Sequence, residues 1–201
     1  ESMNGAMTLN GELFQGKYII NIDSEEEGTI TVSCAGGVTA IITIDKELKD
    51  VDGDKTAYTI DIKGLLGGHS GMEINKQRAN SNVLMGRVIN HLVNTCKLDV
   101  DLVSVSGGAK NNAIPREADA VILVNNADVE RVDAELENIL NIFKNEFKTS
   151  DPDIKLLVKK EASTHTKALT EKVRNNYIAV TMLMPANIQT MSMDIEGLVE
   201  S

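Results

Sequence analysis

One histidine lies among four glycines in residues 64–71, Gly-Leu-Leu-Gly-Gly-His-Ser-Gly. Glycine allows positive φ angles and the close approach of another group, and an imidazole can donate a hydrogen bond or titrate near neutral pH. The stretch could therefore present His69 to a ligand. It could equally be a strand-to-helix turn that holds a histidine by chance, and the motif alone leaves both interpretations open.

A second group of chemically active side chains follows an apolar strand predicted over residues 17–22. Asp23 stands directly at the end of this strand, and Glu25, Glu26 and Glu27 come next. A strand that is apolar throughout is typical of burial on both faces, and open α/β sheets bind their ligands at the carboxyl ends of such strands. Asp23 is therefore a candidate metal ligand, whereas the three glutamates are interpreted as a solvated acidic turn.

The composition argues against several other classes of function. The chain of 201 residues has a formal net charge of −10, so no basic stripe is available to neutralise nucleic-acid phosphates. No apolar run approaches the ~20 residues that a membrane-spanning helix needs. The two cysteines, Cys34 and Cys96, lie in apolar contexts and form no spaced pair, which favours a reducing compartment. We therefore expect a cytoplasmic protein that binds neither nucleic acid nor membrane.

Periodic patterns predict the elements that must position these side chains. From residue 58 the predicted order is strand 58–63, helix 74–94, strand 100–105, strand 118–124, a helix that begins at Asp128 as its N-cap and that Asp151-Pro152 ends, and strand 154–158. This is the order of the split βαβ, or ferredoxin-like, α+β fold, with one antiparallel sheet and both helices on one face. The sequence also predicts strands over 29–33 and 38–44, and a third helix over about 167–183.

Four short motifs occur in order along the chain. They are residues 21–28 (Asn-Ile-Asp-Ser-Glu-Glu-Glu-Gly), 34–37 (Cys-Ala-Gly-Gly), 67–71 (Gly-Gly-His-Ser-Gly), and the loop 107–118, which begins Gly-Gly and ends Asn-Ala-Ile-Pro-Arg-Glu-Ala. Together they resemble the aminoacyl-histidine (Xaa-His) dipeptidases, which are di-zinc metallopeptidases related to carnosinases and carboxypeptidase G. The resemblance covers essentially the whole chain.

The resemblance implies that the chain is an internal part of a longer enzyme, whose catalytic domain is interrupted by an inserted lid, or dimerisation, domain. Residues 1–36 would be a piece of the zinc-binding catalytic domain, residues 37–184 the lid, and residues 185–201 the return toward the catalytic domain. The enzyme would be a homodimer through its lid and would hydrolyse Xaa-His-type dipeptides. By itself the chain is expected to be inactive and to hold neither of the two zinc ions.

The resemblance also implies roles for five residues. Asp23 falls on the position of a zinc ligand, and Glu1 matches the remnant of a glutamate pair that supplies a general base and a zinc ligand. His69 matches a lid histidine that donates to the tetrahedral oxyanion from the other subunit. Asn112 matches a lid asparagine that approaches the substrate, and Arg116 is a candidate to bind the substrate carboxylate.

A different class of function stays open on the residues alone. A free-standing ferredoxin-like module that binds a small molecule or mediates assembly would show the same elements from residue 58 onward. The segment 21–25 argues for the enzyme, because such a module has no need of a catalytic-domain strand. His91 and His165 match no zinc ligand of the family and are expected on a helix face and in a loop.

Overall fold

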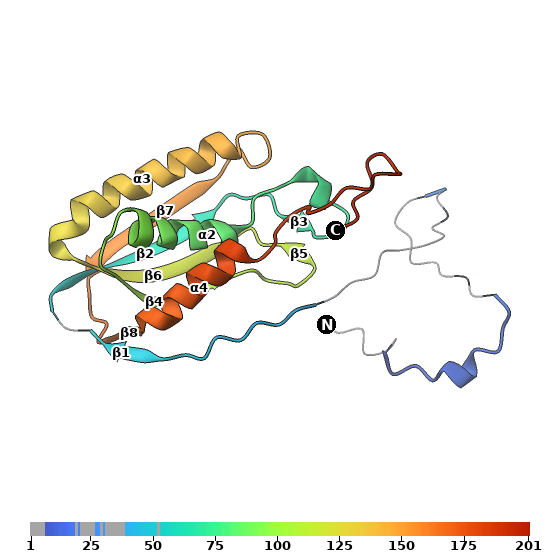
Figure 1. Cartoon of the computed structure of the whole chain (residues 1–201), viewed down its shortest axis with the longest axis horizontal. Helices are drawn as coiled ribbons and strands as arrows, with labels where there is room; N and C mark the ends of the chain where they lie inside the picture. Colours follow the sequence, from blue (N-terminus) through green and yellow to red (C-terminus); the bar gives the residue numbers. More distant parts are fainter. Residues whose placement is uncertain (1–6, 19, 21–26, 29, 31–38, 52) are drawn as a thin grey trace. The chain divides into compact units, whose positions relative to one another are not determined.

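The computed structural model describes residues 7–18, 20, 27–28, 30, 39–51 and 53–201. The chain divides into two units, Glu1–Ala40 and Ile41–Ser201. Among its described residues the first unit has one short 3-10 helix, η1 (Gly11–Leu13), where the side chain of Asn10 accepts a hydrogen bond from the Glu12 N–H. The second unit contains the sheets and the long helices labelled in Figure 1.

The strands predicted near the N-terminus fall largely on residues outside those described. Within the described set, Lys17, Tyr18 and Ile20 lie outside any helix or strand, and the side chains of Tyr18 and Ile20 are exposed. Residues 39–44 also form no strand, so the strand predicted over 38–44 is wrong over its described part. A segment with alternating apolar residues forms a strand only where a neighbouring strand completes its backbone hydrogen bonds. Residues 39–44 pair with no strand that the structure describes, so they lack this partner.

The second unit is built on a four-stranded antiparallel sheet in the order β4-β6-β2-β7. Its strands are β2 (Lys55–Lys63), β4 (Val100–Gly107), β6 (Ala118–Asn125) and β7 (Lys155–Ala162). At the centre of the sheet Tyr58 of β2 pairs with Ile122 of β6 and with Lys160 of β7. One helix follows β2 and another follows β6, which confirms the predicted ferredoxin-like α+β fold.

Two helices cover one face of this sheet (Figure 1). They are α2 (Ser81–Asn90), which continues into the π-helix η3 (His91–Thr95), and α3 (Val129–Glu146). The core between helices and sheet is aliphatic, with fully buried side chains that include Ile60, Ile62, Leu84, Met85, Ile89, Leu92, Leu102 and Ile122. The buried hydroxyl of Tyr58 lies 3.0 Å from Asp133 Oδ1, which fastens the centre of the sheet to α3.

The helix predicted over residues 74–94 begins later than expected. A short 3-10 helix, η2 (Ile74–Lys76), ends at Gln77, whose φ of 48° is left-handed and cannot continue a helix. The helix α2 starts at Ser81, because the Asn80 side chain caps it by accepting hydrogen bonds from the N–H groups of Asn82 (3.0 Å) and Val83 (3.4 Å). The apolar Ile74 therefore belongs to the loop before the helix.

The third predicted helix is also shorter. Residues 167–169 form a strand, β8 (Lys167–Leu169), which pairs antiparallel with β1 (Leu48–Asp50). The helix α4 (Glu171–Leu183) follows and is capped by the Thr170 side chain. It packs against α2, where the absence of a side chain at Gly86 makes room for Thr181.

The second long helix starts where the sequence predicts but is capped differently. Asp128, the last residue of the 3-10 turn η4 (Asn126–Asp128), occupies the N-cap position of α3, yet its side chain makes no capping hydrogen bond. The helix ends at Glu146, before the predicted stop at Asp151-Pro152. The Asp151 N–H donates to the Phe147 carbonyl in the turn that follows.

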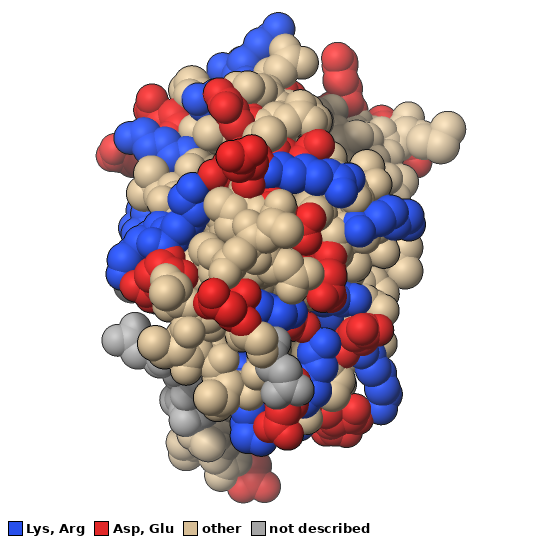
Figure 2. Space-filling model, turned by 90° about the vertical axis from the view of Figure 1, so that its left-hand side faces the viewer, with Lys and Arg blue, Asp and Glu red and all other residues tan. Residues whose placement is uncertain are grey.

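Charged side chains of both signs are interspersed on the side of the molecule shown in Figure 2. The Asp101 carboxylate on β4 is buried instead, and it lies 2.7 Å from Lys49 Nζ of β1 and 2.6 Å from Lys55 Nζ of β2. These two ion pairs connect the strands β1, β2 and β4. Within the described part of the chain, no helix combines the length and the apolar character that crossing a membrane would require.

Candidate functional site

His69 lies where two loops meet at one end of the sheet. The first loop, residues 64–80, joins β2 to α2, and the second, residues 108–117, joins β4 to β6. The short strands β3 (Gly68–His69) and β5 (Ala113–Ile114) pair antiparallel, and the Ser70 N–H donates to the Asn112 carbonyl at 3.0 Å. The fold therefore places the two glycine-rich sequence motifs side by side (Figure 1).

The backbone of its own loop fixes the imidazole of His69. Its Nδ1 accepts hydrogen bonds from the N–H groups of Gly71 (3.1 Å) and Met72 (3.2 Å). A ring nitrogen that accepts carries no proton, so these contacts assign the proton of the neutral ring to Nε2. The side chain is exposed, so the Nε2–H can donate to a group outside the loop. His69 is thus held as a hydrogen-bond donor, with neither nitrogen free to bind a metal in this state.

A glycine and an ionised carboxylate shape the backbone at His69. Gly68 has a φ of 138°, and a Cβ at this position would overlap the Glu73 carboxylate. Glu73 accepts a hydrogen bond from the His69 N–H at 3.0 Å and lies 3.2 Å from Arg78 Nη1, which also donates to the carbonyl just before Gly68. The hydrogen bond from the Lys76 side chain lowers the pKa of Glu73 most. The hydrogen bond from the His69 N–H and the charge of Arg78 add to this effect, and the pKa falls to about 2. The group that holds this turn therefore stays charged at neutral pH.

A buried carboxylate fastens both ends of the first loop. Asp151 Oδ1 accepts a hydrogen bond from the Leu66 N–H, and Oδ2 accepts one from the Ala79 N–H, each at 2.8 Å. The Asp151 side chain is fully buried. Because one carboxylate binds both segments, the two ends of the loop that contains His69 are held at a fixed separation. Asp151 is therefore a positioning residue for His69.

Asn112 and Arg116 lie on the second loop, and the side chains of both are exposed. Asn112 contacts the first loop through its backbone carbonyl. Arg116 lies against Gly67, where an added Cβ would be 3.2 Å from Arg116 Cβ. The structure therefore places His69, Asn112 and Arg116 on the same pair of loops.

Two cavities flank this pair of loops. One has a volume of about 520 Å³ and is lined by Ser70, Ile74, Asn80, Asn82, Gly107, Gly108, Ala109, Lys110, Asn111, Ala113, Ile114, Pro115 and Asn187. The other, of about 570 Å³, is lined by Leu66, Gly68, Gly108, Ala109, Lys110, Ala113, Ile114, Pro115, Arg116 and Glu117. Both volumes are in the range of small-molecule sites. His69 and Asn112 line neither cavity, whereas Lys110 lines both.

The predicted metal ligands, Asp23 and Glu1, lie outside the described residues, so their role stays a prediction. The other two histidines lie where the sequence predicts. His165 is exposed in a loop, and His91 is on a helix, where its Nε2 is 2.7 Å from Glu135 Oε2.

Comparison with known families identifies the domain. Residues 60–151 match the model of the M20 peptidase dimerisation domain. This stretch is therefore similar to an M20 peptidase dimerisation domain. The matched range includes His69, Asn112, Arg116 and Asp151, together with the elements from the end of β2 to α3.

Two dipeptidases are similar to the chain over more than the residues 60–151 that the family model matches. The cytosol non-specific dipeptidase of Escherichia coli (strain K12) is 34% identical over 199 residues, which are 99% of this chain and 40% of the relative. The crystal structure of aminoacylhistidine dipeptidase from Vibrio alginolyticus matches with a TM-score of 0.72 at 27% identity, over 78% of this chain and 31% of that one. The resemblance to this family is confirmed, and the chain spans less than half the length of either relative.

Sequence reasoning missed two residues of this candidate site. Asp151 was interpreted only as a helix stop, because nothing in its neighbourhood predicts hydrogen bonds to residues 85 and 72 positions away. Lys110 was not singled out, although a cation in the glycine-rich loop beside Asn112 was a usable signal. Its ammonium group adds positive charge to both cavities.

Proposed function

We propose that this chain is the lid and dimerisation region of a zinc-dependent cytoplasmic dipeptidase that hydrolyses Xaa-His-type dipeptides. The observation that carries the proposal is the fixed Nε2–H donor of His69, in a domain whose relatives are dipeptidases. The match of nearly the whole chain to one dipeptidase favours this function over a free-standing binding module.

In this proposal His69 stabilises the oxyanion of the tetrahedral intermediate. Two zinc ions, when bound by the catalytic domain, would polarise the peptide carbonyl and lower the pKa of the attacking water. The developing negative charge also needs a hydrogen-bond donor that is already in place before the reaction. The contacts of Nδ1 with Gly71 and Met72 supply this preorganisation, because they fix both the ring and its tautomer.

The second loop would bind the other end of the dipeptide. The Arg116 guanidinium can bind a substrate carboxylate through two parallel hydrogen bonds, and the Asn112 side chain can donate to a substrate carbonyl. Lys110 adds a second cation beside the cavity that Arg116 lines. A dipeptide with a free carboxylate is therefore a better match for this surface than an internal segment of a long peptide.

The proposed enzyme is a dimer in which His69 acts in the active site of the partner subunit. Among the strands that the structure describes, β7 has only β2 as a neighbour, so its outer edge offers unpaired backbone groups. Leu157 and Val158 on this strand are 47% and 40% exposed, and Ile142 on the neighbouring helix α3 is 45% exposed. Pairing of β7 with the β7 of a second copy, with α3 beside it, would bury on the order of 1,200–2,000 Å².

The 201-residue chain by itself is expected to be inactive. Asp23 and at most Glu1 would be present as zinc ligands, whereas a zinc site takes about four. Turnover of an Xaa-His dipeptide by the purified chain with added zinc would refute the proposal that it is a lid region.

Substitution of His69 in the longer enzyme tests the proposed role. His69→Ala should lower kcat by roughly 10²–10³-fold, the scale of one lost oxyanion donor. KM should change far less, because the donor acts mainly in the transition state, and zinc content should stay normal. His165→Ala is the matched control, since His165 is an exposed loop histidine, and should keep full activity. A His69→Ala enzyme with the kcat of the control would reject the catalytic role.

A further inference from the structure

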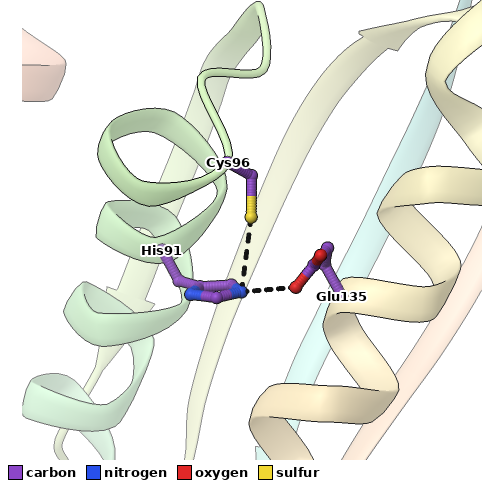
Figure 3. A group of neighbouring side chains, drawn as sticks. All are labelled: His91, Cys96 and Glu135. Atoms are coloured by element: carbon purple, nitrogen blue, oxygen red, sulfur yellow. Dashed lines mark hydrogen bonds and ion pairs between the residues drawn. The ribbon is translucent and has the colours of Figure 1, made fainter.

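Three side chains that often bind metals converge between η3 and α3. His91 Nε2 lies 2.7 Å from Glu135 Oε2 and 3.4 Å from Cys96 Sγ (Figure 3). One ligand atom from each of the three residues lies within 4.8 Å of the others. This group shares no residue with the loops that hold His69, so the proposed peptidase function leaves it unexplained.

A π-helical turn builds this cluster. In an α-helix, residues five positions apart lie about 140° apart around the axis and do not share a face. In η3 the Cys96 N–H instead donates to the His91 carbonyl at 2.9 Å, an i→i+5 hydrogen bond that widens the turn. The wider turn brings the Cys96 sulfur next to the His91 ring, and the imidazole points across to Glu135 on α3 (Figure 3). Single π-turns of this kind are frequent at functional sites.

We propose that His91, Cys96 and Glu135 bind a zinc ion that links η3 to α3. A thiolate, an imidazole and a carboxylate form a donor set that suits zinc, whereas calcium and magnesium prefer oxygen ligands alone. Zinc binds nitrogen at about 2.0 Å and sulfur at about 2.3 Å, so tetrahedral geometry places these two atoms roughly 3.5 Å apart. The distance of 3.4 Å between His91 Nε2 and Cys96 Sγ already matches this value.

The carboxylate needs only a small movement. Tetrahedral zinc separates a nitrogen from an oxygen ligand by roughly 3.3 Å, so Glu135 would move back by about 0.6 Å from its hydrogen bond with His91. Asn138 Nδ2, 3.4 Å from the same carboxylate oxygen, can support it there. The Cys96 sulfur would bind as the thiolate and release its proton to solvent. A water molecule would complete the tetrahedron.

The surroundings allow the ion to enter and hold the ligands in place. The side chains of His91 and Glu135 are 18% and 28% exposed, while Cys96 is buried beneath them. Arg131 on α3 donates to the Cys96 carbonyl at 2.6 Å, which keeps the end of the π-turn against α3. An ion at this position would add a further link between η3 and α3, beside the hydrogen bond from Arg131, and would stabilise the lid independently of catalysis.

Cobalt(II) is the probe for this site, because it replaces zinc and reports a sulfur ligand by a thiolate-to-cobalt charge-transfer absorption band. The 201-residue chain titrated with cobalt should develop this band, and zinc should then abolish it. Cys96→Ser should remove the band, and Glu135→Gln should weaken cobalt binding about 10-fold or more. The matched controls are Cys34→Ser, which changes the other cysteine, and His165→Gln, which changes an exposed histidine. Both should keep the band.

A thermal measurement gives a second readout. Saturating zinc should raise the Tm of the wild-type chain by about 5–10 °C and should leave that of Cys96→Ser unchanged. Circular dichroism of each metal-free variant checks that it is folded. Absence of the cobalt band in the folded wild type, or its persistence in Cys96→Ser, would overturn the proposal. Neither result would bear on the role of His69, which is tested by kcat.

Discussion

At His69 the backbone, rather than another side chain, decides which ring nitrogen carries the proton. A histidine that binds a metal usually donates from its other nitrogen to a carboxylate or a carbonyl. His69 shows the opposite arrangement, since its Nδ1 receives two backbone N–H groups and its Nε2 is left with the proton. The glycine-rich sequence is needed because N–H groups can converge on the ring only where the turn is this tight.

Asp151 gives a prediction at the same scale. Asp151→Asn should lower the free energy of unfolding by about 1–3 kcal/mol, because an amide offers one oxygen where two backbone N–H groups need acceptors. In the longer enzyme the loosened loop should also lower kcat, without a direct contact between Asp151 and substrate. Urea unfolding of the 201-residue chain measures the stability, with Asp153→Asn as the matched control because Asp153 is exposed. Equal stability of the two variants would show that Asp151 does not fasten the loop.

Among the elements, the strands β1, β2 and β4 are connected by one buried charge. Burial alone would raise the pKa of Asp101, but hydrogen bonds from Lys49 and Lys55 lower it below the ordinary value of 3.8. A carboxyl whose pKa is lower in the folded state stabilises the fold fully above its ordinary pKa, and this contribution is lost as the pH falls through the folded value. The stability of the sheet should therefore decline below about pH 4 partly through this group.

Asp101→Asn tests this connection. At neutral pH the variant should lose about 3 kcal/mol of unfolding free energy, because Lys55, whose side chain is 11% exposed, loses its nearest carboxylate and keeps the longer contact of 3.7 Å with Asp99. The difference between wild type and variant should be constant from about pH 7 to pH 5 and should shrink below pH 4. Urea unfolding at a series of pH values from 7 to below 4 measures this difference in stability. Asp119→Asn, on the exposed side of β6, is the control. A difference that does not change with pH would contradict the ionic role of Asp101.

The elements also show what the sequence could predict and what it could not. The strands of the four-stranded sheet and the helix α3 follow from local periodicity, and all were predicted. The start of α2 was misplaced because Ile74 continues the apolar spacing, while the left-handed Gln77 and the cap at Asn80 interrupt the helix. Strand β8 was missed because its partner, β1, lies more than 100 residues away in the chain. A short segment cannot reveal such a partner.

The candidate site was only partly predictable for the same reason. His69, Asn112 and Arg116 were chosen by resemblance, and the fold places them on one pair of loops. Local sequence does not reveal the contacts that fix the site. Asp151 binds Leu66 and Ala79, which are far from it in the chain. The tautomer of His69 depends on how the backbone turns, so that two N–H groups just after the histidine meet its Nδ1. The cluster at His91 depends on a π-turn, which periodicity predicts as ordinary helix.

For the whole molecule, the exposed edge of β7 leads to a prediction about assembly. If the chain dimerises through this strand, Leu157→Lys should weaken the dimer at least about 10-fold, since lysine on an edge strand opposes pairing. Leu183→Lys is the control, because it makes the same substitution at another exposed leucine, at the end of α4. Sedimentation velocity at tens of micromolar measures both. Dissociation of the control and not of Leu157→Lys would place the interface elsewhere.

The central claim, that His69 completes the active site of the partner subunit, is tested most directly by mixing two inactive variants of the longer enzyme. His69→Ala keeps the metal ligands, and Asp23→Ala keeps His69. After subunit exchange, verified by co-purification of differently tagged subunits, each heterodimer would contain one complete site. The mixture should therefore regain roughly a quarter of wild-type activity, because half of the dimers are mixed and each has one intact site of two. A mixture that exchanges subunits and stays as inactive as its parents would contradict the claim.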